Sequence, residues 1–165
     1  MAKKKKRKQK KPNVPVQTIA RSRLDKILTG YYNEELDEEE CVASIRALMG
    51  ELGKEAVLNS LIGMLDNTNA EQKDALMVAL SRLGDEQTIQ HLWQLVRRSK
   101  MSVGGKMTAL VILKQMGEDV DLDNPGEYFS WRDIKKADVG EIAHMGRVGL
   151  QGIIKELQKR ELAKL

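Results

Sequence analysis

The first chemistry that the sequence offers is a run of basic side chains near its beginning. Residues 1–15 contain eight basic residues and no acidic one: Lys3, Lys4, Lys5, Lys6, Arg7, Lys8, Lys10 and Lys11. Such a segment attracts phosphate groups without regard to base sequence, because binding releases counterions from the polyanion. No aromatic residue interrupts the run, so base stacking is not expected there. The pattern therefore favours nucleic acid, RNA included, as the partner.

Two other interpretations of this basic segment stay open. It could bind an acidic protein or an anionic lipid, or serve as a targeting signal, since charge runs of this kind are used in all three ways. It could also keep the chain in solution without binding any partner. Each interpretation depends on the same eight cations.

A second group of basic residues lies farther along the chain. It consists of Arg97, Arg98, Lys100 and Lys106. If these side chains share a face with the N-terminal segment, they form a track for phosphates, so we predict them as additional nucleic-acid-binding residues. The alternative is a solvated helix end, where the helix dipole favours cations without any ligand.

The acidic loop at residues 118–127 has only part of a calcium-binding pattern. Its carboxylates have the first three spacings of an EF-hand loop: Asp119, Asp121 and Asp123. The pattern then fails, because position six is an asparagine instead of glycine and position twelve is a serine instead of glutamate. We expect Val120 and Leu122 to point inward, while the acidic side chains stay in water.

No enzyme or metal site is recognisable by motif. His91 and His144 have no ligand partner at helical spacing, so zinc is not expected. Cys41 is the single cysteine, which excludes an intramolecular disulfide, and its acidic neighbours favour a raised thiol pKa. The sequence contains no glycine-rich phosphate loop and no nucleophile elbow. We therefore predict no cofactor and no catalytic residue.

The composition indicates that the rest of the chain, its body, differs in charge from the basic segment. Hydrophobic residues make up 41% of the 165 residues and aromatic residues only 4%, so the core must consist of aliphatic side chains, which favour helices. Residues 1–30 carry a net charge of +10, whereas residues 31–165 carry −6. No apolar run could span a membrane and no secretory signal follows the charged start, so we expect a cytoplasmic location.

Helical periodicity organises the rest of the chain. Apolar residues at helical spacing predict helices over residues 37–52, 54–65, 69–83 and 85–96. Asp37 is suited to cap the first of them, and Gly53 to end it. Residues 1–15 are predicted to be a disordered basic tail, and residues 16–165 a single helical domain. Within it, residues 18–29 and 128–162 are predicted to cap the two ends.

The apolar pattern of these helices repeats. A shift of 31 residues places Ile45 on Leu76, Met49 on Leu80, Gly53 on Gly84, Leu61 on Leu92 and Leu65 on Val96. A further shift of 33 residues carries Gly84 to Gly117 before the match fails at Pro125. A fixed period of this size is typical of a helical solenoid. We predict full helix pairs at about residues 37–67 and 68–100, and a partial third pair at about residues 101–122.

The segment AEQKDALMVALSRLGDEQTIQHLWQLVRRS resembles a HEAT repeat of the short bacterial type found in phycobilin-lyase-like proteins. It has an alanine-rich first helix, the turn Leu83-Gly84-Asp85 and a second helix with paired leucines. The resemblance covers about residues 37–119 and implies an all-α fold, a right-handed α-solenoid of HEAT-like helix pairs with flanking capping helices. Arrays of this kind serve many unrelated partners, so the resemblance implies a fold and not one particular function.

Two functional hypotheses follow from these patterns. In the first, the chain is a non-enzymatic adaptor whose tail associates with nucleic acid or a ribonucleoprotein and whose solenoid surface binds a protein. In the second, it is a protein–protein interaction scaffold or regulatory subunit with no nucleic-acid role. A more distant hypothesis is a HEAT-type lyase or a DNA glycosylase-like enzyme, for which no catalytic cluster is recognisable.

Overall fold

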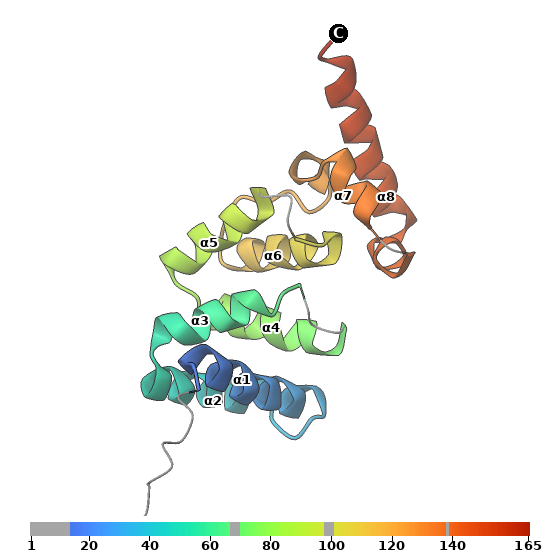
Figure 1. The fold of residues 1–165 in the computed structure, drawn as a ribbon. Helices are drawn as coiled ribbons and strands as arrows, with labels where there is room; N and C mark the ends of the chain where they lie inside the picture. The colour runs from blue at the N-terminus through green and yellow to red at the C-terminus, as the bar shows by residue number, and fades with distance from the viewer. Residues whose placement is uncertain (1–13, 67–69, 98–100, 138) are drawn as a thin grey trace, which may run out of the picture.

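Every regular element that the structure describes is helical. The computed structural model describes residues 14–66, 70–97, 101–137 and 139–165. Its elements are α1 (Val16–Tyr32), α2 (Glu38–Leu52), α3 (Lys54–Gly63), α4 (Ala70–Leu83), α5 (Glu86–Arg97), α6 (Val103–Gln115), the 3-10 helix η1 (Pro125–Tyr128), α7 (Trp131–Lys136) and α8 (Val139–Leu162). No β-strand occurs within these ranges, which confirms the predicted all-α class (Figure 1). None of the described helices is long and apolar enough to cross a membrane.

Helix α2 begins and ends, and α3 begins, at residues that the sequence indicates, whereas α3 ends at Gly63, two residues before the predicted end. Asp37 Oδ1 accepts a hydrogen bond from the Glu40 N–H at 2.8 Å, and the Asp37 N–H donates to Glu40 Oε2 at 2.9 Å. This reciprocal capping box satisfies two backbone N–H groups at the start of α2. Gly53 separates the two helices with a φ of 95°, a conformation that glycine adopts without the steric penalty of a Cβ atom.

The first helix, α1, covers more of the molecule than a terminal cap. It packs against α2 and α3, as expected for a cap of the first pair, and also against α4. Its fully buried apolar side chains are Ala20, Leu24 and Leu28. Polar contacts join the same helices, since Arg23 forms an ion pair with Glu51 on α2 and Gln72 Nε2 on α4 donates to Asp25 Oδ1 at 2.8 Å.

Helix α4 lies between α2 and α6 in the stack (Figure 1). Its Leu76 and Leu80 side chains are completely buried. At its C-terminal end, Arg82 Nη1 lies 3.1 Å from Glu38 Oε1 and 2.7 Å from Glu39 Oε1 at the start of α2. The apolar face of α4 therefore supports the helices on both sides, and its last turn is tied to α2 by exposed ion pairs.

Glycine recurs at the same position of the sequence repeat, for two different physical reasons. Gly53 and Gly117 have φ values of 95° and 93°, in the left-handed region that favours glycine. Gly84 has no such conformation. A Cβ atom there would lie 2.5 Å from the Leu80 carbonyl oxygen and 2.7 Å from Met116 Cε. The same repeat position thus requires backbone freedom in two copies and close packing in the third.

Helix α6 joins the stack to the C-terminal elements. Ser102 caps it, because Ser102 Oγ accepts a hydrogen bond from the Gly105 N–H at 3.0 Å. Asp66, at the end of the first pair, accepts hydrogen bonds from the Ser102 N–H and Oγ–H, both at 2.9 Å. Beyond Gly117 the chain forms a loop, followed by η1 and α7. The last helix, α8, packs on η1 and α6 and extends away from the stack (Figure 1).

The acidic loop between α6 and η1 is anchored by apolar side chains, as predicted. Val120 is buried, and Leu122 is half-buried against the core. The three acidic side chains are exposed: Asp119, Asp121 and Asp123. Asp121 Oδ1 accepts the N–H groups of Asp123 and Asn124, both at 3.1 Å, so it stabilises the turn. Among the described residues, no group of three or more histidine, cysteine or acidic side chains could hold a metal ion.

Candidate nucleic-acid interface

The structure describes two of the twelve residues that the sequence predicts to bind nucleic acid. The eight basic residues of the N-terminal segment lie within residues 1–13, which are outside the described part of the chain. Arg98 and Lys100 are also outside the described part. Arg97 and Lys106 are described, and their environments differ. Arg97 is exposed, whereas Lys106 is 2% exposed. The two described members of the second basic group are therefore divided between the surface and the interior.

Arg97, the last residue of α5, is an exposed cation held against an aromatic ring. Its guanidinium carbon lies 5.5 Å from the centroid of the Trp93 ring, within the range of a cation–π contact. Trp93 is fixed in turn, since its Nε1–H donates to Glu118 Oε1 at 2.7 Å and its ring centroid lies 5.9 Å from that of Tyr128. The charge of Arg97 is thus available to a ligand from a defined position.

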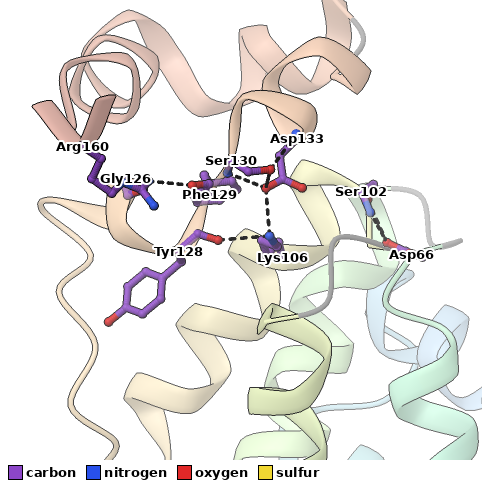
Figure 2. A network of polar contacts seen from close by, with 9 residues as sticks. All are labelled: Asp66, Ser102, Lys106, Gly126, Tyr128, Phe129, Ser130, Asp133 and Arg160. Atoms are coloured by element: carbon purple, nitrogen blue, oxygen red, sulfur yellow. Dashed lines mark hydrogen bonds and ion pairs between the residues drawn. The ribbon is translucent and has the colours of Figure 1, made fainter. Parts of the chain in front are cut away.

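Lys106 serves the interior instead of the surface, so its prediction as a nucleic-acid-binding residue is wrong. Figure 2 shows its ammonium group between the C-terminal elements, where Nζ donates to Asp133 Oδ2 and to the Tyr128 carbonyl oxygen, both at 3.0 Å. The same group lies 5.3 Å from the centroid of the Phe129 ring. The two hydrogen bonds use two of the three ammonium hydrogens, and the ring contact adds a favourable electrostatic interaction. Its charge is neutralised inside the protein and is not available to phosphate.

Asp133 is the partner that makes the burial of Lys106 possible. The Ser130 N–H and Oγ–H donate to Asp133 Oδ2 at 2.7 and 3.0 Å, in a capping box at the start of α7 (Figure 2). Burial raises the pKa of Asp133, but the Ser130 N–H and the Lys106 ammonium outweigh it, and the pKa lies below its ordinary value. The carboxylate therefore stays ionised, and the buried pair is a true salt bridge.

A second set of hydrogen bonds fastens α8 to the η1 turn. Arg160 Nη2 donates to the carbonyl oxygens of Gly126 and Phe129 at 2.6 and 2.7 Å (Figure 2). Gly126 approaches α8 so closely that a Cβ atom would lie 2.5 Å from Glu156 Cβ. Arg160 thus holds the C-terminal elements together, and Lys106 attaches them to α6.

A hollow of about 410 Å³ lies beside Arg97, between α5 and the η1–α7 segment. Its lining consists of Val96, Arg97, Lys106, Glu127, Tyr128, Phe129, Ser130 and Asp133. The two cations are balanced by two carboxylates, so this hollow as a whole does not favour an anion. Burial, with a hydrogen bond to Glu127, raises the pKa of Tyr128 to about 12, which keeps its hydroxyl neutral.

Another hollow, of about 530 Å³, was not predicted from the sequence. It lies along α1 and is lined by Gln17, Thr18, Arg21, Ser22, Asp25, Met64 and Gln72. The first four of these residues are exposed and carry hydrogen-bond donors. Their helical spacing, directly after the basic segment, is the signal that could have identified them, because residues four apart share one face of a helix.

The side chain of Cys41 lies inside the helix stack. It is fully buried, and this burial raises the pKa of its thiol, with a smaller contribution from Glu38. The sequence pointed to the acidic helix start as the cause, and burial proves to be the larger one. A buried neutral thiol has the character of a core residue, because the reactive species is the thiolate.

Comparisons with known proteins add no assignment to these features. No family model, no curated protein and no solved structure matches the chain.

Proposed function

We propose that this chain is a non-enzymatic binding module. Its basic N-terminal segment attracts nucleic acid or a ribonucleoprotein, and its helix stack gives the complex selectivity. The separation of charge along the chain carries this proposal. Residues 1–13 hold eight basic residues and no acidic one, whereas residues 14–165 hold 20 basic and 24 acidic residues. Because an acidic body repels phosphates, the attraction for a polyanion is concentrated in one short segment.

The helix stack is proposed to be a right-handed HEAT-like α-solenoid, which would expose an extended surface to a protein partner. Positions related by the 31-residue shift are buried in both copies: Ile45 and Leu76, Leu61 and Leu92, Leu65 and Val96. In addition, α2 contacts α4, and α4 contacts α6. Such contacts between successive first helices are what a stack of repeats requires, because each repeat buries its apolar face against its neighbours.

Arg97 is the described body residue that the proposal retains from the second basic group. It is exposed, and the Trp93 ring holds its guanidinium in place. Arg98 and Lys100 follow it in the chain and stay predicted contacts. Lys106 is excluded, because Asp133 neutralises its charge in the interior. The body thus contributes a small cationic edge, and the N-terminal segment contributes most of the attraction.

The test is a comparison of two chains of equal length. In the variant, glutamine replaces the eight basic residues of residues 1–13, and the helical body is unchanged. Binding of a labelled short single-stranded RNA is measured by fluorescence anisotropy at low salt. We expect the intact chain to bind and the variant to lose at least roughly a hundredfold in affinity, because non-specific binding comes almost entirely from phosphate contacts. Equal affinity of the two chains would contradict the proposal.

A second candidate function is a protein–protein scaffold, favoured by the exposed acidic segment at the start of α2. Six of the seven residues at 34–40 are acidic, and all six are exposed. Such a surface suits a basic protein partner, since complementary charge steers association. Under this alternative the chain binds no RNA at low salt, so the same binding experiment distinguishes the two. For either function we expect a cytoplasmic location.

A further inference from the structure

One face of α1 continues the basic segment into the folded body. Gln17, Thr18, Arg21 and Ser22 are spaced so that they share a face of the helix, and all four are exposed along the 530 Å³ hollow. We propose that this stripe binds the sugar–phosphate backbone of the nucleic acid that the basic segment attracts. The inference rests on the proposed function and adds a place on the folded surface where the strand is held.

The side chains of the stripe match the chemistry of a phosphate backbone. Arginine, glutamine, serine and threonine are among the residues that position nucleic acids through phosphate and sugar contacts. Arg21 supplies the charge, while the amide of Gln17 and the hydroxyls of Thr18 and Ser22 supply neutral donors. From Gln17 to Ser22 the helix rises by about 8 Å, enough for one or two phosphates of a strand.

The start of α1 is the electrostatically favourable end of this stripe. The N-cap residue is Pro15, which makes no side-chain capping bond, and the first turn contains no acidic residue. The start of α2 is different, because Asp37 caps it and three glutamates occupy its first turn. The partial positive charge of the α1 N-terminus therefore keeps its attraction for an anion, and it reinforces the charge of Arg21.

Neighbouring charges limit the part of the stripe that can bind an anion, and they leave Arg21 as its main cation. Arg23 is already paired with Glu51 on α2, through two contacts, so its charge is partly neutralised. Asp25, one turn beyond Arg21, holds Gln72 Nε2 at 2.8 Å and would repel a phosphate placed beside it. No ion pair of Arg21 occurs among the described residues. The anion-binding part of the hollow is thus confined to the first two turns of α1.

Continuity with the basic segment is the reason to assign this hollow to nucleic acid. Only six positions separate Lys11 from Gln17, which is at most about 20 Å of extended chain. A strand that neutralises the last lysines of the segment is therefore delivered to the start of α1. The hollow beside Arg97 has no such continuity with the basic segment.

The experiment compares the full chain with its Arg21→Gln and Arg46→Gln variants. Arg46 is an exposed arginine on α2 that does not line the hollow, so the control removes the same charge outside it. Glutamine has nearly the helix propensity of arginine, so both variants should fold. We expect Arg21→Gln to weaken the binding of labelled oligouridylate by roughly three- to tenfold, and to reduce the salt slope of log K by about 0.7. Equal behaviour of the two variants would overturn the inference.

Two further readouts make the test specific to the phosphate backbone. Oligodeoxythymidylate should show the same relative loss with Arg21→Gln, and a loss confined to the ribose form would contradict the assignment. On addition of oligouridylate, the backbone amide NMR signals of Gln17, Thr18 and Ser22 should shift in the intact chain, and an absence of such shifts counts against the stripe. If the intact chain binds neither oligonucleotide, the proposed function itself fails. If the intact chain binds both oligonucleotides and Arg21→Gln does not change the affinity, only this inference fails.

Discussion

Replacing Lys106 by methionine tests how the C-terminal elements are attached to α6. Methionine keeps most of the length and apolar character of the side chain but removes the charge that faces Asp133. The side chains of the pair are only 3% and 1% exposed, so water cannot easily take the place of the ammonium. The variant leaves an ionised carboxylate buried without its counter-charge, which is among the most destabilising single changes.

The expected loss of stability in Lys106→Met depends on the hydrogen bonds that Asp133 keeps. Removing one partner of a buried ion pair costs about 3–5 kcal/mol. Asp133 Oδ2 keeps its hydrogen bonds from the Ser130 N–H and Oγ–H, which favours the lower end of that range. The Asp133 Oδ1 atom is buried and has no hydrogen-bond partner, so it offers no compensation. We therefore expect a loss of about 3 kcal/mol, equivalent to a decrease in Tm of about 6–12 °C for a chain of this size.

The assay is urea unfolding followed by far-UV circular dichroism, with Lys114→Met as the matched control. Lys114 is exposed near the end of the same helix, so its replacement should change the free energy of unfolding by less than about 0.5 kcal/mol. A loss below about 1 kcal/mol for Lys106→Met would refute the reasoning, since it would place Lys106 among the exposed pairs. Adding Asp133→Asn to Lys106→Met should recover part of the loss, because the unpaired charge is then removed.

The pH dependence gives an independent check of the same pair. The pKa of Asp133 is lowered in the folded chain, so its stabilising contribution is present above the ordinary carboxyl pKa of about 3.9 and is lost as the pH falls through the lowered value. In Lys106→Met the folded-state pKa should rise, since burial then acts without the ammonium. The difference in stability between the two proteins should therefore be largest at neutral pH and shrink in acid. A difference that is constant with pH would contradict this assignment.

Three substitutions and one labelling experiment test the fold further. Asp37→Ala removes the capping box of α2 and should lower the free energy of unfolding by about 1 kcal/mol in urea titrations. Gly84→Ala should lower the free energy of unfolding by about 1–3 kcal/mol, because the new Cβ atom would meet the Leu80 carbonyl oxygen. Gly50→Ala places its Cβ atom in open space and should raise the free energy of unfolding by about 0.5–1 kcal/mol. Equal effects of the two substitutions would contradict this account. Cys41 should react with a thiol reagent only in urea, because it is buried and its thiol pKa is raised, and rapid reaction in the native state would show an opened core.

The helix boundaries were accessible from the sequence because they depend on neighbouring residues. Asp37 and Glu40 are three positions apart, and both hydrogen bonds of the capping box lie within one turn. Gly53 ends α2 through its own backbone conformation. The inward direction of Val120 in the acidic loop likewise followed from its own apolar character. Local features of this kind can be recognised without knowing how distant segments pack.

Lys106 was misassigned because its environment depends on distant residues. Asp133 is 27 positions away, and the intervening loop follows no repeat pattern. A local signal existed nevertheless, since α6 carries apolar or small residues nearly all round and only one lysine in its first three turns. A helix that is apolar on all sides is buried, so a lone lysine within it needs a buried partner. The stripe on α1 was missed for another reason, because neutral donors resemble an ordinary solvated helix face.

The salt dependence of RNA binding by the full chain tests the central claim most directly. If each of the eight basic residues of residues 1–13 neutralises one phosphate of a single strand, log K should fall with log salt with a slope of about −5 to −6. The chain in which those residues are glutamines should have a slope of about −2 or shallower. A steep slope that the eight replacements reduce to about −2 or shallower is the predicted result. A slope near zero in the intact chain, or one that the replacements leave unchanged, would contradict the account.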